Sequence, residues 1–259
     1  MPVYAEDFEG GVAGTDVTTS NTIATEVYSV AGSGTPQFVS SPVHAGALAM
    51  GCPATEAAAL GFSHADLASG FTVSVWAYLE IHPLVTNLDG FFVSADFATT
   101  PGGTANSSGG WFRFDRAGDY VEFIYEDPVD GSNVNVTVGT GVTGEWRRYE
   151  MTLDAGDQIS AAVYDASNTL IWSQPSMERF VHFGQVPCGA TCNVLGTDYG
   201  MRISLDDLVF TAPGDDDFVP PTILRVYPRK DGLGLSSTPN LIGPGSQQRS
   251  NRIAGGTYY

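Results

Sequence analysis

Charged residues are scarce in this sequence, and basic ones are scarcer still. Only 15% of the 259 residues are charged, and a single lysine stands among the 11 basic residues. The 29 acidic residues give a formal net charge of -18, which disfavours nucleic acid and anionic membranes as partners. No apolar run approaches the length of about 18 residues that a membrane span needs, and residues 1–7 lack the pattern of a signal peptide. We therefore expect no nucleic-acid partner, no membrane insertion and no export signal.

Long helical stripes are also missing, and the dominant pattern has a period of two. Residues 72–79 alternate cleanly, with valine, alanine and leucine on one face and Trp76 and Tyr78 on the other. The pattern predicts further strands over residues 3–9, 22–30, 37–40, 47–50, 111–115, 120–126, 134–138, 146–153, 159–172 (with a bend at residues 165–168) and 201–210. A short helical turn is predicted at residues 54–60, after a proline. About ten strands without βαβ alternation indicate an all-β fold of two packed antiparallel sheets.

The charge is unevenly distributed along the chain. Up to residue 219 there are six arginines against 28 acidic residues, and after it five basic residues against one acid. The change falls within residues 213–221, where an acidic turn and a double proline stop any regular element. Glycine, proline, serine and glutamine are frequent beyond it, as in a linker. We therefore predict a body over residues 1–212 and an extended, basic C-terminal arm over residues 213–259.

Five segments of the body, taken in order, resemble a known family. They are residues 7–10, 41–50, 71–76, 144–150 and 205–210. The set is similar to the concanavalin A-like, laminin-G-like jelly roll, a sandwich found in lectins, carbohydrate-binding modules and adhesive proteins. The resemblance implies a two-sheet antiparallel jelly-roll sandwich. That fold hosts binding, catalysis and scaffolding alike, so function has to be argued from sites.

A pair of acids interrupts the strand pattern of residues 203–210. By alternation, either Asp206 or Asp207 should point toward the interior, where an unpaired carboxylate is costly. The jelly-roll resemblance implies a structural Ca²⁺ between one of this pair and an acid near the start of the chain, Asp7 or Glu9. Carboxylate oxygens suit such a cation. The alternative places Asp206 in a bulge facing water, with Asp7 and Glu9 on an exposed edge.

Catalysis finds little support in the sequence. Jelly-roll glucanases carry closely spaced acids on one strand, because two carboxyl groups must flank one glycosidic bond. The nearest approaches here are residues 6–9 and the pair Glu122 and Glu126 on one strand face. His44 precedes a glycine in a turn and is interpreted as a structural hydrogen-bonding residue. We expect no enzymatic activity.

The sequence alone decides neither whether a disulfide forms nor which aromatic residues could bind a sugar. Cys188 and Cys192 could close a small disulfide loop, which would leave Cys52 single. Sugars stack on flat rings that face water, which makes five residues candidates by type. They are Trp76, Trp111, Trp146, Trp172 and Tyr125. Core packing is the alternative for each of them, so the sequence does not locate a sugar site.

The arm resembles C-terminal tails of virion proteins from tailed phages. Its predicted docking residues are Arg225, Tyr227, Arg229, Lys230, Arg249, Arg252, Tyr258 and Tyr259. The resemblance implies a non-catalytic structural or adhesive virion protein, made in the host cytoplasm and present in many copies. We expect a minor tail protein whose arm docks on other virion proteins and whose body faces a host glycan. The alternatives are a capsid decoration protein of the same design, and a secreted carbohydrate-binding module or glycan hydrolase.

Overall fold

The structure is a computed structural model, and it describes part of the chain. The described residues are 2–30, 35–52, 57–64, 66–67, 70–81, 89–96, 110–115, 119–127, 129–130, 132–154, 158–178, 191–195 and 201–212. The chain divides into two units, Met1–Phe218 and Val219–Tyr259, and every described residue belongs to the first. The predicted arm and its docking residues lie outside the described residues.

The described residues form fifteen β-strands and no α-helix. Along the chain they are β1 (Val3–Glu6), β2 (Glu26–Val30), β3 (Gln37–Val39), β4 (Ala49–Cys52), β5 (Ala57–Ser63), β6 (Gly70–Ile81), β7 (Asp89–Asp96), β8 (Gly110–Asp115), β9 (Tyr120–Glu126), β10 (Asn133–Thr140), β11 (Trp146–Asp154), β12 (Gln158–Tyr164), β13 (Leu170–Glu178), β14 (Thr191–Leu195) and β15 (Met201–Thr211).

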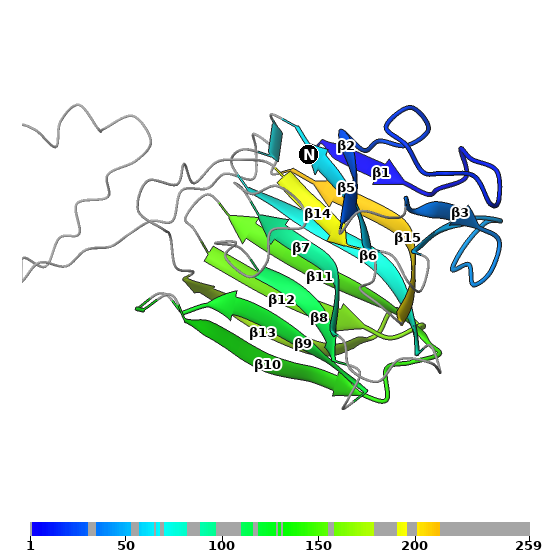
Figure 1. Ribbon diagram of the computed structural model, residues 1–259. Helices are drawn as coiled ribbons and strands as arrows, with labels where there is room; N and C mark the ends of the chain where they lie inside the picture. The colour runs from blue at the N-terminus through cyan, green and yellow to red at the C-terminus, as the bar shows by residue number, and fades with distance from the viewer. Residues whose placement is uncertain are drawn as a thin grey trace, which may run out of the picture. The chain divides into compact units, whose positions relative to one another are not determined.

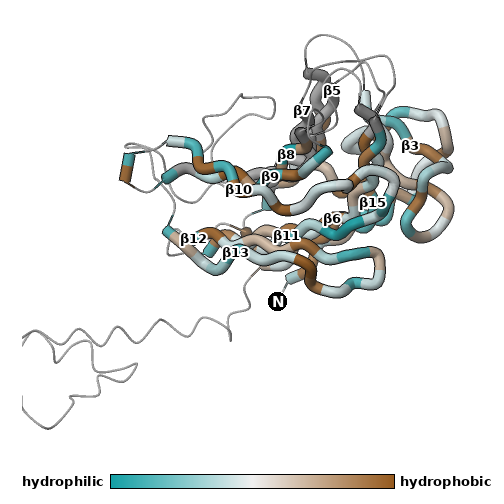
Figure 2. Tube along the Cα trace, turned by 90° about the horizontal axis from the view of Figure 1, so that it is seen from below, coloured by the Kyte–Doolittle hydropathy of each residue, from teal (hydrophilic) through white to brown (hydrophobic). Residues whose placement is uncertain are grey.

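The strands build two sheets that lie in two layers (Figures 1 and 2). Sheet A has eight strands in the order β13-β12-β11-β6-β15-β4-β3, with β1 also paired to β15. Sheet B has seven, in the order β10-β9-β8-β7-β14-β5-β2. The pairs between these strands are antiparallel. The prediction of an all-β, two-sheet antiparallel jelly-roll sandwich is confirmed.

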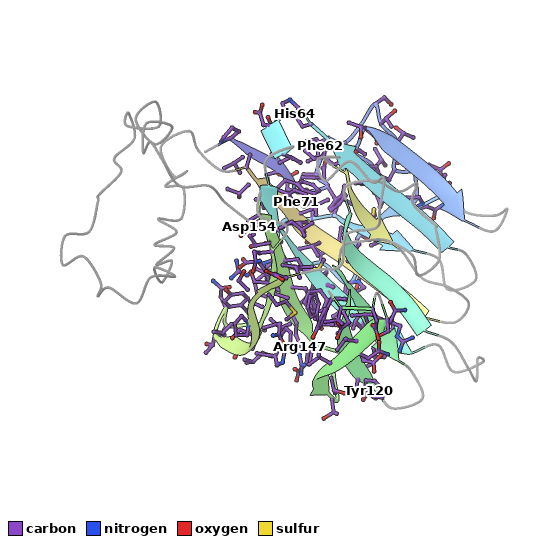
Figure 3. The ribbon with its side chains drawn as sticks, turned by 90° about the vertical axis from the view of Figure 1, so that its left-hand side faces the viewer. Phe62, His64, Phe71, Tyr120, Arg147 and Asp154 are labelled. Carbon is purple, nitrogen blue, oxygen red and sulfur yellow. The ribbon has the colours of Figure 1, made fainter. Side chains whose placement is uncertain are left out.

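The core lies between the two sheets and is filled by alternate residues of the strands. Val73, Val75 and Leu79 of β6 are at most 1% exposed, whereas Tyr78 on the opposite face is partly exposed. Each large side chain buried in this way contributes about 1.5–3 kcal/mol to folding. Figure 3 shows the side chains filling the space between the layers, Phe62 of sheet B and Phe71 of sheet A among them. The two faces predicted for residues 72–79 are present, and the face of valine, alanine and leucine is the inner one.

The helical turn predicted at residues 54–60 is wrong over its described part. Residues 57–60 belong to β5, which pairs with β2 on one side and β14 on the other. Leu60 and Phe62 of this strand are buried in the core. Pairing on both edges and core burial together outweigh the helical preference of three consecutive alanines.

Two more differences concern a turn within a predicted strand and two strands that were not predicted. The strand predicted over residues 159–172 is two strands, β12 and β13, joined by a turn. Asp165 accepts hydrogen bonds from the N–H groups of Ser167 and Thr169, and Asn168 has a φ of 60°. An Asx turn of this kind reverses the chain instead of bending it. Strands β7 and β14 were not predicted from the sequence.

Candidate functional site

The outer face of sheet A, which is turned away from the core, carries ordered rows of side chains. Antiparallel pairing places directly opposite residues on the same face. Across β6, β11 and β12 the outer rows are Trp76–Arg148–Tyr164, Ser74–Glu150–Ala162 and Thr72–Thr152–Ser160, and Tyr78 pairs with Trp146. This face therefore combines aromatic, charged and hydroxyl groups on three central strands.

One end of the face holds a cluster of aromatic rings. The imidazole of His44 stacks on Trp76, with ring centroids 3.9 Å apart and planes 16° apart. Trp146 meets His44 edge-on at 5.6 Å, and Tyr78 lies 5.5 Å from Trp146. Trp76 is only 9% exposed, because His44 covers it. We refer to His44, Trp76, Tyr78 and Trp146 as the aromatic cluster.

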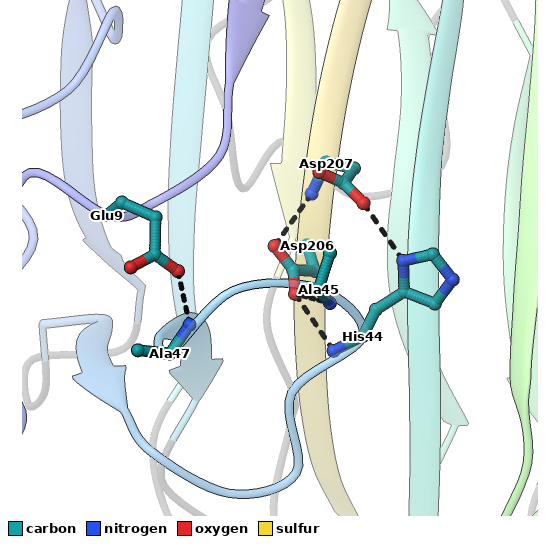
Figure 4. Close-up of polar contacts among 6 residues, drawn as sticks. All are labelled: Glu9, His44, Ala45, Ala47, Asp206 and Asp207. Atoms are coloured by element: carbon teal, nitrogen blue, oxygen red, sulfur yellow. Dashed lines mark hydrogen bonds and ion pairs between the residues drawn. The ribbon is translucent and has the colours of Figure 1, made fainter.

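Two aspartates of β15 hold His44 in place (Figure 4). The backbone N–H groups of His44 and Ala45 donate to Asp206 Oδ2 at 2.9 and 3.1 Å. His44 Nδ1 lies 2.9 Å from Asp207 Oδ2, and because a carboxylate only accepts, the imidazole is the donor. These contacts confirm the interpretation of His44 as a structural hydrogen-bonding residue.

Glu9 holds the same loop from the other side (Figure 4). The N–H groups of Ala47 and Leu48 donate to Glu9 Oε1 at 2.7 and 2.9 Å. Gly46, which directly precedes these two residues, has a φ of +68°, and a Cβ at this position would collide with the same Glu9 oxygen. Carboxylates near the start and near the end of the described chain thus hold the loop of residues 40–48, which we call the clamped loop.

A β-bulge explains where the two aspartates point. The register between β15 and β6 shifts between Asp206 and Val209, and Asp207 has a φ of 47°. Asp206 pairs with Trp76 on the outer face, yet it is 0% exposed because the clamped loop covers it. One carboxylate of the pair is buried as expected and does not face water, but Asp206 lies under the clamped loop and not between the two sheets. The buried acid lies between the sheet and a loop, and the bulge keeps the core-facing alternation intact at Leu208.

Burial also changes the acidity of Asp206. Desolvation raises the pKa of its carboxyl group to about 6, aided by the charge of Asp207, while three backbone N–H donors act in the opposite direction. Burial likewise raises the pKa of Glu6, whose oxygens accept the N–H groups of Phe8 and Ile23 at 2.8 and 2.7 Å. Both acids are loop-fixing residues in a low-dielectric setting.

The predicted calcium ligands are fixed by N–H groups rather than gathered around one point. Asp7 Oδ1 accepts the N–H of Glu9 at 3.1 Å, and both oxygens of Asp206 accept backbone donors. Across the described residues, no three His, Cys, Asp or Glu side chains come together in a way that could hold a metal ion. The donor set therefore fits loop fixation, and calcium at Asp7, Glu9, Asp206 and Asp207 stays a prediction.

A shallow depression lies next to the aromatic cluster on the outer face. It has a volume of about 230 Å³ and crosses β11, β12 and β13. Its lining includes Glu150, Thr152, Ser160, Ala162 and Tyr164. The guanidinium of Arg148 lies 3.9 Å above the ring of Tyr164, and Arg148 Nη1 is 3.5 Å from Glu150 Oε2. We call this depression the Ala162 dish, after the residue at its centre.

The other sugar candidates lie elsewhere. Trp172 packs against Phe112 and Phe123 on the core side, and Tyr125 also contacts Phe123. The side chain of Trp111 lies outside the described residues. Only Trp76 and Trp146, of the candidates whose side chains are described, reach the outer face of sheet A.

The glutamate pair considered for catalysis has one described member. Glu122 of β9 forms an ion pair with Arg113 of β8 and is 7% exposed. A buried carboxylate that is already engaged by an arginine is shielded from a substrate. The side chain of Glu126 and residue Cys188 of the predicted disulfide lie outside the described residues, so the bridge between Cys188 and Cys192 stays a prediction.

Sequence reasoning did not select Arg148, Glu150, Ala162 or Tyr164. Alternation alone places each of them on an outward face. Their neighbourhood depends on the pairing of β11 with β12, which is set by the register of Glu150 opposite Ala162. The one signal in the sequence is that Ala162 is a small residue between Ser160 and Tyr164 on the same face of the strand.

The comparisons with known proteins agree with the fold. Neither a family model nor a curated protein matches the chain. A protein of unknown function from Shewanella oneidensis MR-1 shares 16% identity at a TM-score of 0.54, over 81% of this chain and 85% of that one. This likeness supports the two-sheet β-sandwich fold and no more.

Two further solved structures are similar at lower TM-scores. A carbohydrate esterase of the Shiga toxin-encoding bacteriophage phi24B shares 14% identity at a TM-score of 0.47, covering 73% of this chain and 90% of that one. The cellulose induced protein Cip1 shares 15% identity at 0.47, covering 81% and 97%. Among the described residues, no helix has the length and apolar character to span a membrane.

Proposed function

We propose that this chain is a non-catalytic, carbohydrate-binding protein carried on a tailed-phage particle. The binding part rests on one observation, the outer face of sheet A. There the partly exposed rings of Tyr78, Trp146 and Tyr164 stand beside carboxylate and hydroxyl groups. Sugars offer the same combination of apolar faces and hydroxyl edges, so this surface is chemically matched to them.

The setting of these side chains also supports a binding role. They project from central strands of sheet A, with β6 paired to β11 and β15, and β11 paired to β12. Groups on rigid, paired strands lose little conformational entropy when a ligand arrives. His44, fixed by Asp206 and Asp207, further restricts the aromatic cluster. A preformed surface of this kind fits recognition of a rigid sugar ring.

The virion part of the proposal rests on the sequence of the arm. An acidic body and a basic extension form a two-part design, in which arginines such as Arg225 and Arg229 pair with acidic neighbours in an assembly. A minor tail protein with its sandwich turned toward the host envelope is the preferred form. A capsid decoration protein uses the same design and is the second form.

Two experiments test the two parts separately. A glycan array probed with the full-length protein should show saccharide binding, and incubation with the bound polysaccharide should release no new reducing ends. Deletion of residues 220–259 from the phage-encoded gene should leave a folded protein that fails to enter particles. Normal incorporation of the shortened protein would contradict the docking role, and cleavage of the polysaccharide would contradict a non-catalytic role.

A further inference from the structure

The Ala162 dish exists because one small side chain stands in a row of larger ones. In the outer row Ser74–Glu150–Ala162, the methyl group of Ala162 projects least from the sheet. Ser173 of β13 continues this row beyond Ala162. The flanking rows carry Thr152 and Ser160 on one side and Arg148 and Tyr164 on the other. Larger neighbours around a short residue leave a hollow in an otherwise filled surface.

The dish is small and its lining is rich in hydrogen-bonding groups. Its volume of about 230 Å³ lies below the roughly 300–1,000 Å³ typical of drug-sized ligand sites. The polar residues of the lining that share the outer face are Glu150, Thr152, Ser160, Tyr164 and Ser173. This size and chemistry fit a single ring that carries several hydroxyl groups.

Glu150 of the lining and Arg148, which adjoins the dish, place an acceptor and a donor side by side. Their charged groups lie 3.5 Å apart and are 23% and 26% exposed, respectively. The guanidinium also rests on the ring of Tyr164 at 3.9 Å, which restricts its motion. Two neighbouring sugar hydroxyls, each able to donate and to accept, match such a pair.

The same pair argues against a negatively charged ligand. An anion would have to draw Arg148 away from Glu150 and would face the field of a chain with a formal charge of -18. A ligand without charge meets neither cost. It can bond to Glu150 and Arg148 while their ion pair stays in place.

We propose that the Ala162 dish binds one ring of an uncharged saccharide, with Glu150 accepting from its hydroxyl groups. This assignment deepens the proposed function and rests on it. The bound ring lies over Ala162, between Tyr164 on one side and Thr152 and Ser160 on the other. The ligand class is thus a neutral hexose unit rather than a uronic or sialic acid.

The test compares matched sugars on the full-length protein by saturation-transfer NMR and titration calorimetry. The probes are methyl glycosides of glucose, galactose and mannose, each beside its hexuronic acid counterpart. At least one neutral glycoside should bind tenfold or more tightly than its uronic acid partner, with an affinity that is insensitive to salt. Ala162→Leu, which fills the dish, should abolish binding, and Glu150→Gln should weaken it about tenfold.

Two further variants control the experiment. Thr137→Leu adds an apolar side chain at an exposed position of β10 in sheet B and should leave binding unchanged. Ala162→Ser keeps the residue small and should retain binding, which separates filling of the dish from misfolding. Equal melting temperatures across the set complete the control.

Each adverse result has its own meaning. Preferential, salt-dependent binding of uronic acids would overturn the assignment while leaving carbohydrate binding intact. Neutral binding that survives Ala162→Leu would overturn the location. Absence of binding to every probe, together with a blank glycan array, would remove the proposed function as well.

Discussion

The imidazole of His44 lies flat on the indole of Trp76, with ring centroids 3.9 Å apart. His44 belongs to the clamped loop, and Trp76 to β6 at the centre of sheet A. Glu9, near the start of the chain, and Asp206, near the end of the described part, both bond to this loop. Through this contact, the clamped loop that Glu9 and Asp206 hold is packed against the aromatic cluster on the outer face of sheet A.

Replacing His44 by alanine should destabilise the body and uncover Trp76. The loss combines a ring stack with a hydrogen bond to Asp207, worth about 1–3 kcal/mol together. Denaturant unfolding should show this decrease, and acrylamide should quench tryptophan fluorescence more strongly in the variant. His64→Ala is the matched control, because the ring contacts of His64 are Tyr4 and Phe62. An unchanged quenching constant in the His44 variant would contradict the covering role.

Substitution of Gly46 by alanine should cost more than the same change at Gly14. Both glycines have positive φ, +68° and +82°, but a Cβ at Gly14 meets nothing within 4 Å, whereas one at Gly46 meets Glu9. Gly14→Ala then measures the backbone cost alone, about 1–2 kcal/mol. Gly46→Ala adds the loss of the Glu9 hydrogen bonds, about 1–3 kcal/mol more. Equal losses of stability would show that Glu9 does not hold the clamped loop.

Stability should fall as the pH rises through the pKa of Asp206. Burial raises this pKa from 3.8 to about 6, so the folded state retains a proton that the unfolded chain releases between these values. The stability that protonated Asp206 contributes is present below about pH 4 and lost above about pH 6, a change of at most about 3 kcal/mol. Asp206→Asn removes this titration.

The measurement is urea unfolding from pH 4 to 7.5 in EDTA, for the wild type and Asp206→Asn. Glu6 titrates in the same direction in both proteins, so the difference between the two curves isolates Asp206. The free energy of unfolding of the wild type should decline with pH more steeply than that of the variant. The difference in slope corresponds to at most one proton, or about 1.4 kcal/mol per pH unit. Parallel curves would mean that Asp206 titrates as an exposed acid.

Calcium binding by Asp7, Glu9, Asp206 and Asp207 remains a proposal with a direct test. An ion bound to the native state raises its stability, so EDTA should lower the melting temperature by several degrees and added Ca²⁺ should restore it. Bound calcium would also reverse the pH dependence, because the ligands must be ionised. A melting temperature that is the same in EDTA and in Ca²⁺ would contradict calcium binding at these residues.

Much of the fold follows from local pattern, and the exceptions have a physical reason. Alternation over residues 72–79 predicts both faces of β6, because each face has a distinct environment. The alanine-rich start of β5 looks helical in isolation, and only its neighbours β2 and β14 make it a strand. Pairing between distant segments is a tertiary effect that propensity does not contain.

The candidate site was less predictable than the fold. Acids near the start of the chain and near the end of its described part were predicted to share one site, and the structure shows Glu9 and Asp206 bonded to one loop. The bulge at Asp207 changes which face of sheet A the neighbouring residues of β15 occupy. No residue type in the sequence marks the position of this bulge. The Ala162 dish depends on the register of three strands, which a single strand's sequence does not specify.

The most direct test of the central claim is a map of amide chemical-shift changes on titrating the full-length protein with the best-binding saccharide. The account predicts shifts concentrated in β11, β12 and β13, around Glu150, Ala162 and Ser173, with smaller shifts near the aromatic cluster. Shifts confined to sheet B, or a saturable titration that leaves these strands unchanged, would contradict a sugar site on the outer face of sheet A.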